Sequence, residues 1–179
     1  PVVDFRQSEW RQVQQLHGHI QLMGWFGLFA MGMGYRLVAR FTAVHARPPA
    51  LVPLTFLLMV GGLALRTAAQ PWADGGTFSA LFALSAVLEA AAALIFAAMI
   101  LRSIFRGRAE HFGYSPFFAA GAVWVALAML LNLVSVVDAA RDSTPTISAA
   151  RSSAITFAQL YGFVAMFVLA VSLRTFPIF

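Results

Sequence analysis

The sequence predicts an all-α integral membrane protein, because of its composition and because it contains five long apolar segments. Of its 179 residues, 60% are hydrophobic and only 11% are charged, whereas soluble domains carry roughly 25% charged residues. Each segment is long enough to cross a hydrocarbon core of about 30 Å, which takes roughly 20 helical residues. We expect transmembrane helices at residues 16–40, 50–69, 78–102, 115–138 and 153–175.

Residues 1–15 precede the first of these helices and mix polar, charged and apolar side chains, which is typical of an external loop or a short surface helix. Residues 16–179 form the predicted transmembrane bundle. Short turns between continuous helices satisfy the backbone polar groups without water. The turns contain residues that commonly end helices, namely Pro48, Pro49, Pro71, Gly75, Gly76, Gly113, Pro116 and Pro145.

The charged residues exclude some functions and indicate an orientation. The net charge is +5, all twelve basic residues are arginine, and cysteine is absent. Disulfides, thiolate metal sites and thioether-linked haem are therefore excluded within these residues. Basic loops are usual on the cytoplasmic side of membrane proteins, so we interpret the charge in that way and not as nucleic-acid binding. The partners that we expect are the lipid bilayer and other membrane subunits.

Seven arginines follow the first, third and fifth helices, and this side is predicted to be cytoplasmic. They are Arg36, Arg40, Arg47, Arg102, Arg106, Arg108 and Arg174. The remaining five are assigned to the opposite, outer side: Arg6, Arg11, Arg66, Arg141 and Arg151. The chain starts at Pro1 and stops just after an apolar run, so we expect it to be a piece of a longer protein.

A motif of the first predicted helix recurs 138 residues later, in the fifth. Gln21, Leu22, Gly24, Phe29, Arg36 and Phe41 return as Gln159, Leu160, Gly162, Phe167, Arg174 and Phe179, and Phe163 answers Trp25. A period of four helices returns the chain in the same orientation. The predicted repeat is therefore parallel, unlike the inverted repeats of many transporters.

His17 and His19 are the candidate metal or cofactor ligands. They lie near the outer end of the first helix, where a histidine is partly removed from water. Two positions apart on a helix, they point about 160° away from each other and do not easily share one metal unless the helix is frayed there. We expect one ring to serve as an axial haem ligand and the other to form a hydrogen bond or a second site. The alternative is a pair of interfacial histidines that bind no metal.

Glu89 is the one carboxylate deep within a predicted span. An ionised carboxylate there costs on the order of 2.5–3.5 kcal/mol, so we expect it to be protonated or paired. It either transfers protons, or bonds to a cofactor, or forms an interhelical hydrogen bond, for example to Asn132. Gln21, Gln159 and Asn132 are interpreted as hydrogen-bonding side chains between helices.

The first repeat copy resembles the NnrS family of bacterial membrane proteins. The resemblance is carried by His17-Gly18-His19, Gln21-Leu22-Met23-Gly24-Trp25, Met33-Gly34-Tyr35 and Arg40-Phe41, and in the second copy by Tyr161-Gly162-Phe163 and Arg174-Thr175-Phe176-Pro177. It implies a twelve-helix bundle distantly similar to haem-copper oxidase subunit I, with haem b and copper and a role in the response to nitric oxide. On that comparison the visible helices are the second to the sixth.

One departure from the oxidases limits what the resemblance implies. The fifth predicted helix has no histidine, so the oxidases' copper-binding position is empty and reduction of oxygen or nitric oxide at a haem-copper centre is not expected. We expect a haem-binding protein of the bacterial cytoplasmic (inner) membrane, with a redox or nitric-oxide-response role through His17 or His19. The alternative is a cofactor-free accessory subunit of a larger respiratory or photosynthetic complex. A transporter would need helices broken near mid-membrane, for which Gly61-Gly62 is the one candidate.

Overall fold

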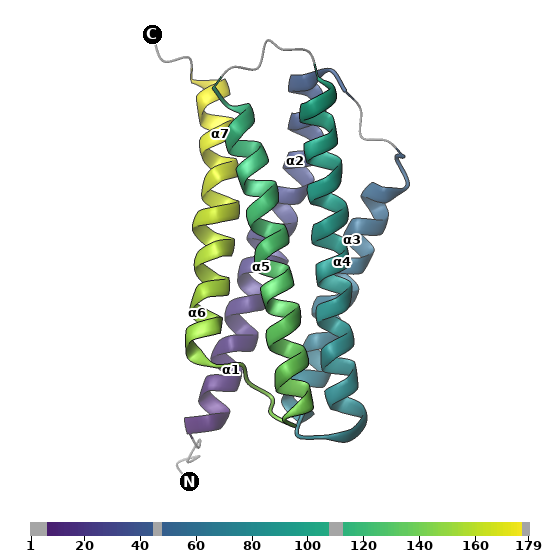
Figure 1. The fold of residues 1–179 in the computed structure, drawn as a ribbon, viewed down its shortest axis with the longest axis vertical. Helices are drawn as coiled ribbons and strands as arrows, with labels where there is room; N and C mark the ends of the chain where they lie inside the picture. Colours follow the sequence, from purple (N-terminus) through teal and green to yellow (C-terminus); the bar gives the residue numbers. More distant parts are fainter. Residues whose placement is uncertain (1–6, 45–47, 108–112, 177–179) are drawn as a thin grey trace.

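Five long helices run up and down the molecule, and its described part begins and ends at opposite ends of the bundle (Figure 1). The computed structural model describes residues 7–44, 48–107 and 113–176, and every regular element in these ranges is helical. All five are long and apolar enough to span a membrane: Glu9–Thr42, Leu51–Trp72, Gly76–Arg106, Ser115–Arg141 and Ala149–Thr175. The predicted all-α class is confirmed, with five helices long and apolar enough to span a membrane, and the larger twelve-helix bundle with its four-helix repeat stays a prediction.

Three of the five long helices change type along their length. The first consists of α1 (Gln7–His19), the π-helix η1 (Ile20–Gly27) and α2 (Leu28–Thr42), and the second of α3 (Leu51–Ala69) and the 3-10 turn η2 (Gln70–Trp72). The third is α4 (Gly76–Arg106) and the fourth is α5 (Ser115–Arg141). The fifth consists of α6 (Ala149–Phe157), the π-helix η3 (Ala158–Val164) and α7 (Ala165–Thr175).

The first helix begins earlier than predicted. It starts at Gln7 instead of residue 16, so residues 7–15 extend the first span and do not form a separate loop or surface helix. Polar side chains of this extension are bonded to neighbouring turns: Gln12 donates to the Gln70 carbonyl at 2.9 Å and Gln15 to the Ile147 carbonyl at 2.8 Å. Residues 1–6 of the predicted external segment lie outside the described residues.

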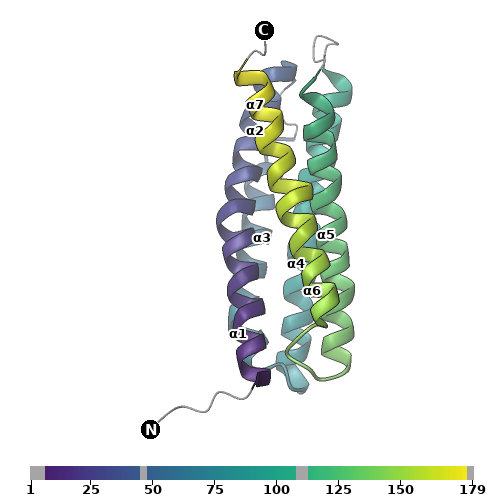
Figure 2. The same ribbon diagram turned by 90° about the vertical axis from the view of Figure 1, so that its left-hand side faces the viewer.

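Helices α4 and α5 pack against each other along their length, and each also packs against a further long helix (Figures 1 and 2). Helix α3 packs along α4, the fifth long helix packs along α5, and the first contacts α4 and touches η3 through η1. The core contains interlocking rings of Phe96, Phe118, Phe163 and Phe167, whose centroids lie 5.1–5.9 Å apart in the contacting pairs. Edge-on and tilted packing at this spacing is favourable for aromatic rings.

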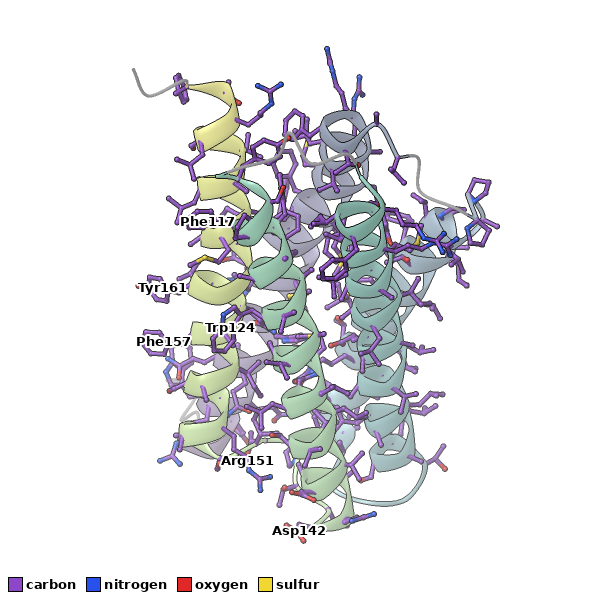
Figure 3. The ribbon with its side chains drawn as sticks, turned by 45° about the horizontal axis from the view of Figure 1, so that its top comes forward. Phe117, Trp124, Asp142, Arg151, Phe157 and Tyr161 are labelled. Carbon is purple, nitrogen blue, oxygen red and sulfur yellow. The ribbon has the colours of Figure 1, made fainter. Side chains whose placement is uncertain are left out.

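Close approach between α5 and the fifth long helix depends on glycine. A Cβ on Gly162 would lie 2.5 Å from Cγ of Trp124, so the indole ring packs directly on the backbone there (Figure 3). On the outer face of the same helix, the exposed rings of Phe157 and Tyr161 stack with centroids 5.4 Å apart. This helix therefore has an inner face shaped for protein and an outer face suited to lipid.

The two repeat copies share a backbone feature that the sequence did not predict. The π-helical segments begin at Ile20 and at Ala158, which are 138 residues apart, the same shift that relates the sequence motifs. Short π-helical segments are rare and often occur at functional sites. Helix α3, in contrast, continues unbroken through Gly61 and Gly62, so the helix break that a transporter would need is not found at this position.

One arginine of the orientation argument is buried in the bundle and does not lie in a turn. Arg66 was assigned to the outer side with the loop arginines, but it is only 1% exposed and lies inside the bundle on α3. Three other arginines in the argument, Arg6, Arg47 and Arg108, lie outside the described residues. The remaining assignments, and therefore the orientation in the membrane, stay predictions.

Candidate functional site: a buried polar cluster with a polar approach

Five buried polar side chains meet between the helices, and we call them the polar cluster. They are His19 on α1, Arg66 on α3, Gln70 at the start of η2, Glu89 on α4 and Asn132 on α5, and none is more than 8% exposed. Ionisable side chains inside a membrane span are costly and commonly mark functional sites. Four of the five long helices contribute to this one cluster.

Glu89 is the centre of the polar cluster. Its Oε2 atom lies 2.7 Å from Nε2 of His19, accepts a hydrogen bond from Nδ2 of Asn132 at 3.3 Å, and lies 3.7 Å from Nη1 of Arg66. Arg66 Nη1 also donates to Oδ1 of Asn132 at 3.1 Å. Of the two states expected for Glu89, protonated or paired, the contacts show pairing, and the interhelical hydrogen bond to Asn132 is present; a role in proton transfer or cofactor binding stays a prediction.

Further contacts hold the Arg66 side chain in place. Its Nε donates to Oε1 of Gln70 at 3.1 Å, and Gln70 Nε2 donates onward to the Pro145 carbonyl at 3.0 Å. The guanidinium carbon lies 5.4 Å from the ring centre of Phe82, within range of a cation–π interaction. A buried charge needs such a complete set of partners, because desolvation otherwise exceeds the attraction.

Gly62 allows α3 and α4 to approach closely enough for Arg66 to reach Glu89. A Cβ at this position would lie 2.8 Å from Cγ of Glu89 and 2.9 Å from the Ser85 carbonyl oxygen. The side chain of Glu89 therefore rests against bare backbone. The glycine that the sequence offered as a helix break instead permits a close helix crossing.

A small cavity borders the polar cluster. Its volume is about 70 Å³, and its lining includes His19, Arg66, Asn132, Thr156 and Gln159. A water molecule occupies about 30 Å³ of the liquid, so the space suits roughly two waters or one small ion. Among the described residues, two buried side-chain atoms have no hydrogen-bond partner: Nε2 of Gln159 and Oε1 of Glu89.

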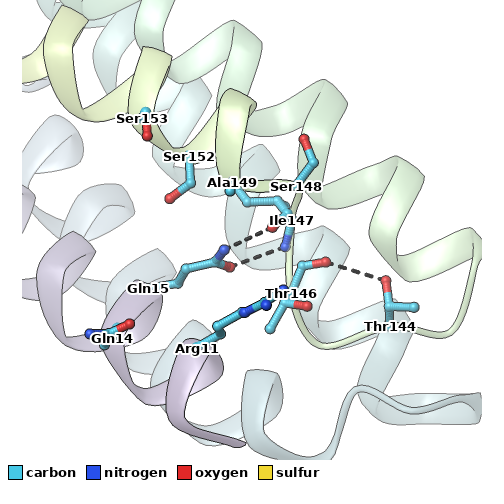
Figure 4. Close-up of a pocket in the computed structure, with 10 residues that line it drawn as sticks. All are labelled: Arg11, Gln14, Gln15, Thr144, Thr146, Ile147, Ser148, Ala149, Ser152 and Ser153. Carbon is cyan, nitrogen blue, oxygen red and sulfur yellow. Dashed lines mark hydrogen bonds between the residues drawn. The ribbon is translucent and has the colours of Figure 1, made fainter. Parts of the chain in front are cut away.

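A wider hollow of about 550 Å³ leads from the end of the bundle toward this cavity, and we call it the vestibule (Figure 4). It lies between α1, the beginning of α6 and the loop before α6. The cavity and the vestibule share four lining residues, Gln14, Gln15, Ile147 and Ser152. Gln15 holds the loop in place, because its amide bonds to both the carbonyl and the N–H of Ile147. Together the two spaces form a polar approach to the cluster from one end.

The two histidines point in opposite directions, as predicted. His19 faces inward to Glu89, and His17 is exposed on the other side of α1. One turn beyond His17, a hollow of about 410 Å³ is lined by Gln21, Trp25, Phe26 and Phe29, which we call the aromatic shelf. In the described part of the chain, no three His, Cys, Asp or Glu side chains come together as a metal-binding group.

The predicted polar residues divide between two places. Glu89 and Asn132 belong to the polar cluster and Gln159 lines its cavity, whereas Gln21 is exposed at the aromatic shelf. Arg66 and Gln70 were missed. A signal for them was present, since both lie on the helical face marked by Met59, Gly62 and Leu63, three to four residues apart.

The fold and the site define a class: a multi-pass helical membrane protein with an ion-pair cluster inside the bundle and a polar approach from one end. Comparison with family models, with curated proteins and with solved structures gave no match.

Proposed function

We propose that the chain is the haem-binding part of a redox membrane protein linked to the response to nitric oxide, with His17 as an axial haem ligand. The observation that carries the proposal is a contrast between the repeat copies. Gln159, Phe163 and Phe167 are 1%, 0% and 4% exposed. Their counterparts on the aromatic shelf face outward, directly beside the exposed histidine. In the second repeat copy this helix face is buried against the rest of the protein. In the first copy the same face is exposed, and it lies beside His17, whose imidazole is suited to bind iron.

The residues of the aromatic shelf fit a large flat cofactor. Its hollow of about 410 Å³ lies within the range of roughly 300–1,000 Å³ typical of small-molecule sites. Trp25 and Phe29 are 78% and 68% exposed and offer broad apolar surfaces. His17 and Gln21 are neighbours on the helix surface, since they lie four residues apart. The haem ring would therefore have an imidazole ligand and apolar contacts on one continuous helix face.

His19 fits this role less well. Its Nε2 atom is engaged by Glu89 at 2.7 Å, and the adjoining cavity of about 70 Å³ is too small for a porphyrin. The sequence did not decide which of the two histidines is the haem ligand, and the geometry favours His17. No three His, Cys, Asp or Glu side chains come together within the described residues, so nothing in their arrangement adds support for copper.

A bound haem supplies one-electron transfer and an iron atom with affinity for nitric oxide. The chain's own residues have simpler tasks. His17 would hold the iron through a neutral imidazole, and Trp25, Phe26 and Phe29 would exclude water from the ring. The His19–Glu89 pair holds α1 against α4 and so fixes the direction in which His17 points. We place the protein in the bacterial cytoplasmic membrane, with lipid and further membrane subunits as partners.

A reduced-minus-oxidised visible spectrum of the full-length protein tests the proposal. We expect a low-spin haem band that is lost in His17→Ala and kept in His19→Ala, and that shifts when nitric oxide is added. Loss in His19→Ala alone would transfer the ligand role to His19. A wild-type protein without haem would favour the alternative, a cofactor-free accessory subunit whose aromatic shelf packs against another subunit.

A further inference from the structure

The side chain of Gln159 leaves a donor unused where the bundle has room for a ligand. The residue is 1% exposed, its Nε2 atom has no hydrogen-bond partner, and it lines the small cavity beside the polar cluster. Leaving a buried donor unpaired costs about 1–3 kcal/mol. An acceptor that enters the cavity would remove this cost, so the donor calls for a water oxygen or an anion.

The residues lining the cavity and the vestibule carry positive and neutral side chains only. Arg66 and His19 line the cavity, Arg11 lines the vestibule, and the other lining residues are amides, hydroxyls and apolar groups. No aspartate or glutamate is among them. A cleft lined by one sign of charge raises the local concentration of the opposite ion.

The start of α6 adds to this positive potential. Ser148 caps the helix by accepting a hydrogen bond from the N–H of Arg151, and Ser148, Ala149 and Ser152 line the vestibule. Free N–H groups and the helix dipole favour an anion at a helix N-terminus. An anion approaching from this end passes Arg11 and the helix start before it reaches Arg66 and Gln159.

Glu89 offsets the charge of Arg66, but it does not line the cavity. Its Oε2 atom faces His19, Asn132 and Arg66, and Glu89 is not among the cavity-lining residues. Arg66 is shared between the carboxylate and the cavity, since it lies 3.7 Å from Glu89 and also lines the cavity wall. The ion pair thus holds a guanidinium beside a space that its partner carboxylate does not line.

From these observations we propose that the cavity is a binding site for one small monovalent inorganic anion of about the size of chloride, held by Arg66 and the Gln159 amide. The volume of about 70 Å³ limits the ligand, because it accommodates roughly two waters and excludes larger organic anions. The proposal is independent of haem at His17, which lies on the opposite face of α1.

The test measures the thermal stability of the full-length protein in detergent, with sodium chloride replaced stepwise by sodium gluconate at constant ionic strength. Because a ligand that binds only the folded state stabilises it, we expect chloride to raise Tm by about 2–4 °C in a saturating manner. Bromide should act like chloride, and crystals grown with bromide should show an anomalous peak between Arg66 and Gln159.

Two matched variants locate the effect. Gln159→Leu removes the unpaired donor without opening a large void, so the protein should still fold and should lose the chloride dependence of Tm. Gln21→Leu is the same change at the equivalent repeat position, where the side chain is exposed and does not line the cavity. It should keep the chloride dependence. Equal Tm in chloride and gluconate, or a chloride effect that persists in Gln159→Leu, would overturn the proposal and leave water as the occupant.

Discussion

The first and fifth long helices carry the same motif but are held in the bundle by different forces. The fifth is held by buried rings, with Phe163 and Phe167 inside the aromatic core. Much of the first helix's attachment is polar, since His19 bonds to Glu89 and Tyr35 bonds to Thr55 at 2.8 Å. Within a membrane, apolar packing gains no hydrophobic driving force against lipid, so packing fit and hydrogen bonds decide which helices associate.

This difference teaches that the motif does not determine which face is buried. The counterpart of Phe167 is Phe29, which is 68% exposed, and the counterpart of Tyr161 is Met23, which is fully buried while Tyr161 is 57% exposed. The two copies thus present opposite faces to the bundle. The aromatic shelf is the first-copy equivalent of a surface that the fifth helix keeps inside protein.

The largest expected effect comes from breaking the polar attachment of the first helix. Glu89→Leu leaves Arg66 buried without its carboxylate and His19 without its bond, and removing one partner of a buried pair costs about 3–5 kcal/mol. Unfolding in mixed detergent micelles measures the loss. The double variant Glu89→Leu with Arg66→Met should recover much of it. A single variant as stable as the wild type would contradict the role given to the polar cluster.

Truncating the two equivalent rings tests the packing side of the comparison. Phe167→Ala opens a void among Phe96, Phe118 and Phe163, and such changes cost about 3–5 kcal/mol. Phe29→Ala removes an exposed ring and should change the stability of the haem-free protein by less than about 0.5 kcal/mol. The same unfolding assay compares them. Equal losses in the two variants would show that the first-copy face is already buried against protein.

A third pair of variants addresses the approach of α3 and α4. Gly62→Ala places a methyl group against Glu89 and the Ser85 carbonyl, and overpacking of this kind costs about 1–3 kcal/mol. Gly61→Ala is the matched control, because a Cβ there meets no atom within 4 Å. In the same unfolding assay, the free energy of unfolding of Gly62→Ala should be lower than that of Gly61→Ala by at least about 1 kcal/mol. Similar values would mean that the helices can separate without loss.

The smallest effect is expected at the exposed beginning of the fifth helix. Arg151 and Asp138 form an ion pair at 2.6 Å, with side chains 46% and 40% exposed. Exposed pairs contribute about 0–1 kcal/mol. Arg151→Ala should therefore lower the free energy of unfolding by less than about 1 kcal/mol, and only at low salt. A larger loss would indicate that the vestibule end supports the fold more strongly than its exposure suggests.

The sequence predicted the helices well because their apolar length is a property of each segment alone. It also identified Glu89 and Asn132, since a polar side chain deep in an apolar run needs a partner. It failed for Arg66, because Arg66 lies close to the helix end and resembles an arginine of the loop. It could not place Gln21 and Gln159 in different surroundings, because equal motifs carry no information about which neighbours each copy meets.

The buried Arg66 also constrains how the chain enters the membrane during synthesis. Helix α3 emerges before α4, so its arginine reaches the bilayer before Glu89 exists as a partner. A lone arginine at mid-helix costs roughly 2.5–3.5 kcal/mol on insertion, although a position near the end of the span lessens this. Insertion of α3 and α4 as a pair, joined by the short turn at residues 73–75, would neutralise the charge on entry. The ion pair would in that case favour the entry of two neighbouring helices together over the entry of α3 alone.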